Sequence, residues 1–167
     1  MNKPLVRIDR LDRSILAELQ RDGSLSNQQL AERIGLSPSP CLRRIKALEE
    51  AGIILRRVTL LERKMLGLSL TVLLMIGMDR HTPERFESFE REVATIDEVL
   101  ECYLVTGQQA DYMLKLVVPD MESYQQLLLN RITRISGVSG VHSSFVLRRV
   151  VDRTELPLSY LQPAAGK

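Results

Sequence analysis

The side chains best suited to bind another molecule are basic groups gathered in and after one predicted helix. Arg43, Arg44 and Lys46 lie within four consecutive positions, and a further arginine pair follows the helix. Guanidinium and ammonium groups bind phosphate, and arginine also pairs with the guanine edge in the DNA major groove. We therefore predict a DNA-binding surface in which Arg43 and Arg44 reach bases. The predicted backbone contacts are Ser37, Ser39, Lys46, Arg56 and Arg57.

The helix that carries this basic group has a stiff beginning and a charge gradient. Ser37 is the predicted N-cap, and Pro38 and Pro40 fall in the first turn, where their missing N–H groups would have no helical partner. The basic residues occupy the first half of the helix, and Glu49 and Glu50 stand in its last turns. A recognition helix enters the major groove with its N-terminal residues, so this order keeps acidic groups away from phosphate. Helical spacing predicts one buried stripe made of Cys41, Leu42, Ile45 and Leu48.

The other reactive side chains are isolated from one another in the sequence. His81 and His142 have no second ligand at metal-binding spacing, so we predict no metal site. Cys41 and Cys102 form no CxxC pair, which favours a reducing compartment, and their positions in a helix and a strand predict burial. No nucleophile–base pair, P-loop or dinucleotide fingerprint is present. We therefore predict neither catalysis nor a cofactor.

The charge of the 167-residue chain is divided unevenly. Residues 1–60 carry 11 Lys/Arg and 7 Asp/Glu, whereas residues 61–167 carry 12 and 14. This distribution predicts a basic, anion-binding module joined to a mildly acidic second part. The longest apolar run, residues 66–78, contains Gly and Ser and is too short to span a bilayer, and the first residues lack a signal-peptide pattern. We expect a cytoplasmic protein that does not bind a membrane.

Three predicted helices make up the first part of the chain. The first begins at Asp9 and stops before Gly23, and the second lies between a Ser26 N-cap and Gly35, with Gln29 completing a capping box. The third is the basic helix of residues 37–51. A tight glycine turn between the second and third helices is typical of a helix-turn-helix. Residues 53–66 are rich in β-branched and apolar side chains, and we predict one or two short strands there.

The second part alternates strands and helices in a recognisable order. Predicted strands at 68–79, 99–107, 111–120 and 140–152 are interrupted by predicted helices at 82–97 and 121–137. This β-α-β-β-α-β order is that of a ferredoxin-like fold, so the fold class is α+β. The predicted division is a DNA-binding domain at 1–60, a linker at 61–67, a ligand-sensing and oligomerisation domain at 68–158, and a tail at 159–167.

The sequence resembles the Lrp/AsnC (leucine-responsive regulatory protein) family of transcription regulators over residues 8–158. The resemblance rests on LDRSIL, ELQRDG, SNQQLAERIGLSPSPC and LEEAGII in the first part, and on ECYLVTG, DYMLKLVVPDMESYQQLL, GVHSSF and ELPL in the second. It implies a winged helix-turn-helix followed by a ferredoxin-like sensor, often called RAM. It also implies homodimers that assemble into octamers, and an amino-acid effector bound between sensor domains.

The family's effector loop corresponds here to residues between two strands. The resemblance implies effector contacts from Thr106, Gly107, Gln108, Gln109, Ala110, Asp111 and Tyr112. The family usually has two residues between the glycine and the Asp-Tyr pair, and this chain has three. Ser143 and Ser144 are candidates for lining a pocket between subunits, although two serines on a strand also fit a plain polar face.

These observations favour a sequence-specific regulator that binds double-stranded DNA and responds to an amino acid. Two alternatives stay open at this point. A ferredoxin-like regulatory subunit of a metabolic enzyme would use the helices to bind protein, but the core of an obligate interface is usually poor in charge. A global DNA-organising protein would bind DNA with weak sequence preference.

Overall fold

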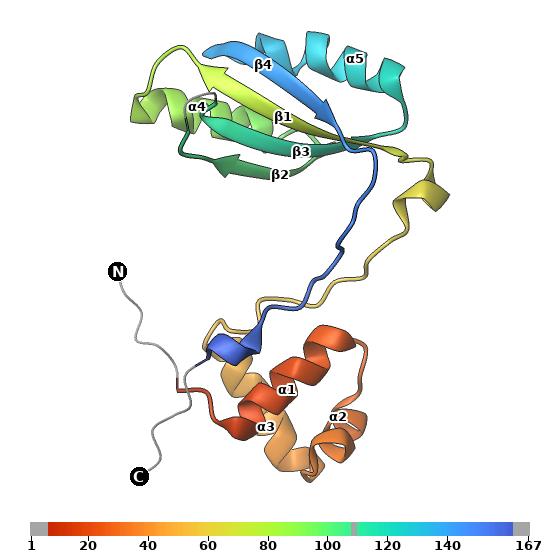
Figure 1. The fold of residues 1–167 in the computed structure, drawn as a ribbon. Coiled ribbons are helices and arrows are strands. Elements are labelled where there is room, and N and C mark those ends of the chain that lie inside the picture. The colour runs from red at the N-terminus through yellow and green to blue at the C-terminus, as the bar shows by residue number, and fades with distance from the viewer. Residues whose placement is uncertain (1–6, 108–109, 162–167) are drawn as a thin grey trace. The chain divides into compact units, whose positions relative to one another are not determined.

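The computed structural model describes residues 7–107 and 110–161, which belong to two units. The first unit contains the described residues up to 60 together with residues 151–161. The second unit contains residues 61–150. Figure 1 shows helices in the first unit and a sheet with helices in the second, as the sequence predicts.

Three helices form the core of the first unit. They are α1 (Arg10–Arg21), α2 (Asn27–Ile34) and α3 (Pro38–Glu50). Gly35 ends α2 with a left-handed φ of 69°, a conformation that glycine adopts without steric cost. The helices pack around a set of buried apolar side chains, which are Ile15, Leu16, Leu25, Leu30, Ala31, Cys41, Ile45 and Leu48.

Side-chain caps fix where the helices begin. The predicted box at α2 is confirmed, because the Gln29 N–H donates to the Ser26 hydroxyl at 3.3 Å and the Ser26 N–H donates to the Gln29 side chain at 2.9 Å. Asp9 and Asp12 make the same reciprocal pair at α1, with distances of 2.8 and 3.1 Å. Ser37 stands at the N-cap of α3 with Pro38 at the first position, as predicted. Its hydroxyl makes no capping hydrogen bond within the described chain.

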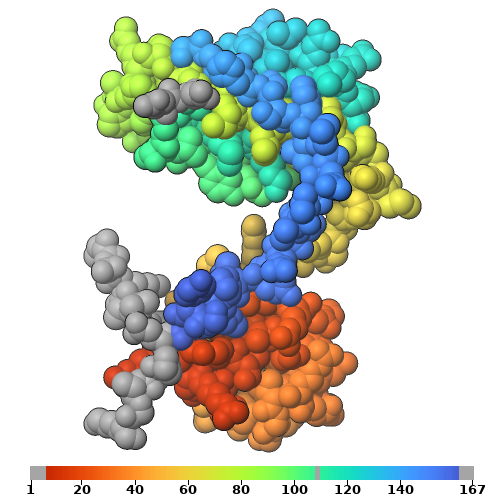
Figure 2. Space-filling model, viewed as in Figure 1, coloured from red at the N-terminus to blue at the C-terminus, as the bar shows by residue number. Residues whose placement is uncertain are grey.

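The C-terminal segment, residues 155–161, packs on α1. Leu158 lies against the apolar core of the first unit, in a short 3₁₀ helix that spans Leu158–Tyr160. The Gln20 side chain accepts from the Leu156 N–H at 2.7 Å and donates to the Leu156 carbonyl at 3.3 Å, and Arg13 donates to the Leu161 carbonyl at 2.6 Å. Figure 2 shows this segment, in blue, against the red surface of α1. The sequence predicts a sensor domain up to residue 158, but the structure groups residues from 151 onward with the helices.

A four-stranded antiparallel sheet forms the second unit. Its strands β1 (Leu70–Met78), β2 (Val99–Leu104), β3 (Tyr112–Val118) and β4 (Val138–Phe145) are ordered β2-β3-β1-β4. Helices α4 (Pro83–Val93) and α5 (Met121–Asn130) follow β1 and β3, and both lie behind the sheet in Figure 1. The ferredoxin-like prediction is confirmed.

Alternation along the strands separates two faces of this sheet. Val72, Leu74 and Ile76 are fully buried against the helices, where they join a core with Phe89 and Tyr124. The opposite side, which we call the open face, is covered by no helix in the described residues. Alternation and strand register assign to the open face Leu73, Met75, Tyr103, Met113, Lys115, His142 and Ser144.

Two predicted strand regions differ from the structure. Residues 55–62 form no strand in the described chain, and Leu55, Val58 and Leu60 are exposed. A strand needs a neighbour for its N–H and C=O groups, and β propensity alone supplies none. A 3₁₀ helix at Arg63–Leu66 then leads to β1. The last strand ends at Phe145 instead of residue 152, because its pairing with β1 ends there.

Candidate nucleic-acid interface and ligand loop

The outward face of α3 combines polar, charged and apolar side chains. These side chains surround a hollow of about 410 Å³ and recur at helical spacing, namely Ser39, Leu42, Arg43, Lys46, Ala47 and Glu50. All six are exposed in the described structure. The basic groups Arg43 and Lys46 lie between the hydroxyl at the helix start and the carboxylate at its end. This arrangement suits a ligand that is negatively charged and presents hydrogen-bond acceptors.

Arg44 points away from this face and binds α1. Its guanidinium contacts the Asp9 and Asp12 carboxylates, each at 2.7 Å, and the side chain is 30% exposed. The pKa of Asp9 is lowered, mainly by the hydrogen bond from the Asp12 N–H and further by Arg44. Because its guanidinium binds both carboxylates, Arg44 joins the start of α1 to α3. The two carboxylates also offset the arginine charge. The sequence grouped Arg44 with Arg43 as a base-reading residue, but the structure separates their contacts.

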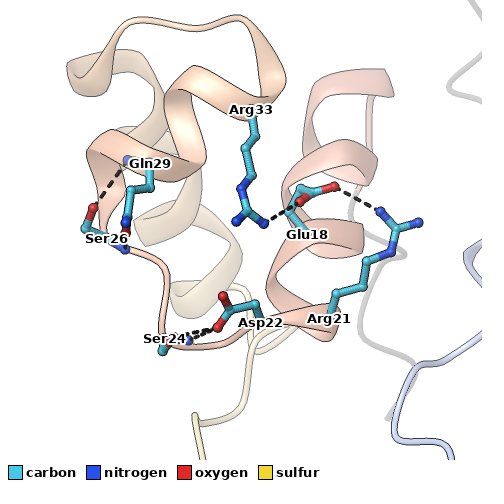
Figure 3. A network of polar contacts seen from close by, with 7 residues as sticks. All are labelled: Glu18, Arg21, Asp22, Ser24, Ser26, Gln29 and Arg33. Carbon is cyan, nitrogen blue, oxygen red and sulfur yellow. Dashed lines mark hydrogen bonds and ion pairs between the residues drawn. The ribbon is translucent and has the colours of Figure 1, made fainter.

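A second set of contacts holds α2 beside the other helices. Asn27, the first residue of α2, donates its amide to the Pro38 carbonyl at 2.8 Å, which fixes the turn between α2 and α3. Glu18 on α1 accepts from Arg21 at 3.0 Å and from Arg33 on α2 at 3.2 Å. Figure 3 shows the contacts of Glu18 with Arg21 and Arg33 together with the Ser26–Gln29 cap. These contacts orient the N-terminal turn of α3 relative to the rest of the unit.

The remaining predicted DNA contacts are exposed on two segments. Ser37 and Ser39 lie at the N-terminal end of α3, where the helix dipole also favours an anion. Arg56 and Arg57 are exposed on the extended segment that follows the helix. Leu42 is 43% exposed, so its predicted place in the buried stripe is wrong. Cys41, Ile45 and Leu48 of that stripe are buried as predicted.

Asp111 organises the loop that the sequence predicts to bind an effector. Its carboxylate accepts from the Met78 N–H at 2.7 Å and contacts the His81 Nε2 at 2.6 Å. Its own N–H donates to the Ile76 carbonyl, and its carbonyl accepts from the Val105 N–H, both at 2.8 Å. The loop is therefore tied to the end of β1 at several points. Asp111, the partner of His81, lies 30 positions away in the chain, so residue spacing did not predict this contact.

The other predicted loop residues differ in accessibility. Thr106 and Gly107 are exposed, whereas Ala110 is buried, and Gln108 and Gln109 lie outside the described residues. Tyr112 is 1% exposed and donates to Glu90 at 2.8 Å from within the core. Burial, followed by the bond to Glu90, raises the pKa of Tyr112. Among the described loop residues, Thr106 and Gly107 are the most accessible to a ligand.

Ser143 and Ser144 lie on opposite faces of the sheet. Ser143 faces α5 and is hydrogen-bonded to the Tyr124 hydroxyl, whereas Ser144 belongs to the open face. Ser143 pairs with Leu74 of β1, four residues before the Met78 N–H that holds the loop. At a rise of about 3.4 Å per residue, that separation is roughly 14 Å along the strand. The structure therefore does not bring the two serines together with Asp111.

Cys102 and its neighbours on β2 are more exposed than strand alternation predicts. β2 is an edge strand, and Leu100 and Leu104 are 54% and 57% exposed. Cys102 is exposed and lies beside a cavity of about 330 Å³ that Glu90 also lines. Local desolvation, followed by the Glu90 charge, raises the pKa of the Cys102 thiol, which disfavours a reactive thiolate. The predicted burial of Cys102 is wrong because, among the described strands, the edge strand β2 has no neighbour on that side.

Within residues 7–107 and 110–161, no three His, Cys, Asp or Glu side chains are arranged to hold a metal ion. Among the helices of this part of the chain, none is long and apolar enough to cross a bilayer.

Comparison with known proteins connects both units to one family. Residues 8–54 match the winged helix-turn-helix DNA-binding model, and residues 71–156 match the Lrp/AsnC ligand binding domain. The chain is 42% identical over 154 residues to the leucine-responsive regulatory protein of Escherichia coli, an alignment that covers 92% of this chain and 93% of that protein.

Solved structures give the same result. A transcriptional regulator from Neisseria meningitidis, crystallised as an L-Met complex, aligns with a TM-score of 0.88 and 38% identity. An AsnC family transcriptional regulator from Agrobacterium tumefaciens aligns with a TM-score of 0.87 and 40% identity. Each alignment covers 92% of this chain and 99% of the other. The chain belongs to the Lrp/AsnC family: it is a transcriptional regulator with a winged helix-turn-helix DNA-binding domain and a ligand-binding domain, and not an enzyme.

Proposed function

We propose that the outward face of α3 reads duplex DNA in the major groove. Arg43 contacts base edges, because it is exposed in the first half of the helix and lies on the face away from the core. The phosphates are contacted by Ser37, Ser39, Lys46, Arg56 and Arg57, which are all exposed. Arg44 positions α3 through Asp9 and Asp12 instead of reading a base. The observation that carries this proposal is the exposed face of α3, where Arg43 and Lys46 form no ion pair within residues 7–107 and 110–161.

Binding of the full chain to duplexes selected from a random library tests this proposal. Arg43→Ala is expected to lose about 1–3 kcal/mol of binding free energy on the selected sequence and to relax the sequence preference at one base pair. Lys46→Ala is expected to weaken binding to all sequences alike. It should also reduce by about one the magnitude of the slope of log binding constant against log salt concentration. Arg91→Ala, on the exposed surface of α4, serves as the matched control. An Arg43→Ala protein with unchanged affinity and preference would exclude α3 as the reading helix.

The ligand of the second unit is proposed to be a small amino acid bound at residues 106–112. Support comes from the match to a ligand-binding domain and from the similar Neisseria meningitidis regulator, whose structure contains L-Met. The exposed Thr106 and Gly107 offer backbone and hydroxyl groups to such a ligand, while Asp111 holds the loop in place. The extra loop residue is expected to change which amino acid is preferred.

Calorimetry of the full chain with individual amino acids tests the ligand. A methyl group added at Gly107 meets no atom within 4 Å, so Gly107→Ala is expected to fold normally and to weaken binding by obstructing the loop surface. Gly140→Ala, which also adds its methyl into open space, is the control. If no amino acid gives binding heat, or if both variants bind equally well, the ligand does not bind at this loop.

We further propose a homodimer formed through the open face of the sheet, with assembly of dimers into octamers in the cytoplasm. Leu73, Met75 and Met113 form an apolar area on this face, which a second copy would remove from water. Dimerisation also suits DNA recognition, because paired recognition helices read two half-sites.

A further inference from the structure

Leu42 is an apolar side chain in the middle of the proposed reading surface. It is 43% exposed, and the polar residues Ser39, Arg43 and Lys46 surround it on the outward face of α3. Its neighbour Cys41 is fully buried, which shows that the helix turns its apolar stripe away from Leu42. A leucine in this place needs a reason other than the folding of the first unit.

Packing within the first unit does not supply that reason. The described core of this unit contains Cys41, Ile45 and Leu48 from α3, and its partly buried neighbours do not include Leu42. Replacing Leu42 with a smaller residue would therefore leave the described core intact.

The surroundings of Leu42 restrict what it can contact. Arg43 and Lys46 favour a polyanion, and one exposed leucine is much smaller than the apolar area that a stable protein interface needs. In the major groove of DNA, the apolar group among the base edges is the C5-methyl of thymine, and aliphatic side chains contact it. Basic neighbours that bind phosphates and base edges would bring Leu42 to that methyl group.

We propose that Leu42 contacts the C5-methyl of a thymine and thereby selects one A·T pair beside the base pair that Arg43 reads. This inference rests on the proposed function of α3 as the reading helix. Arg43 would supply hydrogen bonds to one base pair, and Leu42 would supply methyl recognition at another. Specificity would then combine a polar and an apolar contact from consecutive residues.

Single thymine-to-deoxyuridine replacements in a duplex selected by the wild-type full chain test the proposal, since each removes one methyl group. One replacement is expected to lower wild-type affinity about fourfold, the fold-change that corresponds to burial of one methyl-sized group. The affinity of Leu42→Ala is expected to be unchanged by deoxyuridine at that thymine. A double-mutant cycle that combines Leu42→Ala with each deoxyuridine replacement should therefore give a coupling energy at that thymine and at no other. Lys46→Ala, the control, is expected to bind more weakly while keeping the wild-type sensitivity.

Several results would overturn the proposal. A wild-type protein insensitive to every deoxyuridine replacement, or a Leu42→Ala protein with undiminished sensitivity, removes Leu42 as a methyl reader but leaves α3 as the DNA-binding helix. A full chain that binds no duplex overturns the proposed function and this inference together. Circular dichroism of Leu42→Ala, expected to match the wild type, separates lost recognition from lost folding.

Discussion

Adjacent arginines have different surroundings at the residue scale. Arg43 lies on the outward face of α3, whereas Arg44 is held by two carboxylates of α1. Helical spacing could predict that Arg43 points away from the core, because that depends on the helix alone. It could not predict the partners of Arg44, since Asp9 and Asp12 lie at the start of another helix. Leu42 was misplaced for the same reason: the width of the buried stripe depends on what packs against it.

Replacing each arginine with alanine is expected to separate stability from DNA binding. Arg44→Ala removes charge-assisted hydrogen bonds to Asp9 and Asp12, and after allowance for partial exposure we expect a loss of about 1–2 kcal/mol in the free energy of unfolding of the first unit. Arg43→Ala is expected to leave that free energy unchanged. Calorimetric melting of both variants measures the difference. Equal melting temperatures would show that the Arg44 ion pairs contribute nothing to stability.

Asp9 makes the first unit sensitive to acid. Its pKa is lowered in the folded state by the Asp12 N–H and by Arg44, so the ionised carboxylate favours folding. This stabilisation is present above the ordinary pKa of aspartate, about 3.9, and is lost as the pH falls through the lowered folded value. Asp9→Asn keeps a capping side chain without the charge. Urea unfolding between about pH 5 and 2.5 is expected to show a wild-type advantage that shrinks with acidity; a constant difference contradicts this.

The helices and strands with their own periodic patterns were predictable at the element scale. The cap of α2 and the order of the sheet elements depend on neighbouring residues and hydrophobic alternation. Residues 55–62 and the C-terminal segment depend on contacts with distant residues, which local patterns do not contain. The Asp111–His81 contact is another case, because a loop and a post-strand turn meet only after the sheet has formed.

The C-terminal segment is expected to stabilise the first unit. Leu158 is half-buried against its core, so Leu158→Ala should cost about 1 kcal/mol of that unit's unfolding free energy. Leu156 contributes backbone hydrogen bonds but has a 71% exposed residue surface, which makes Leu156→Ala a matched control. Differential scanning calorimetry of the full chain measures both. If the two variants melt alike, Leu158 does not anchor the segment.

At the scale of the whole molecule, the open face of the sheet is the proposed dimer interface. Alternation along the strands predicts two faces, but it cannot identify what covers the second one. Met75 lies on this face between Met113 of β3 and His142 of β4. A proposed dimer would bury these side chains against a second copy.

Met75→Glu is expected to convert the proposed dimer into monomers, because a carboxylate would be desolvated in the interface. Met121→Glu is the control, since Met121 is an exposed methionine in the first turn of α5, where an acidic residue is favourable. Sedimentation velocity measures the assembly state of both proteins. A Met75→Glu protein that keeps the wild-type sedimentation coefficient would rule out this face.

The return of the chain to α1 has a consequence for synthesis on the ribosome. The three helices emerge early, but the groups that Arg13 and Gln20 bind, and the side chain of Leu158, are added only after the entire sheet has been translated. At about 5–20 residues per second, the α1 surface waits roughly 7–30 s for its last partners. The DNA-binding unit is thus completed after the ligand-binding sheet. A truncated chain that ends before residue 155 would contain the recognition helix but lack the C-terminal contacts that stabilise α1.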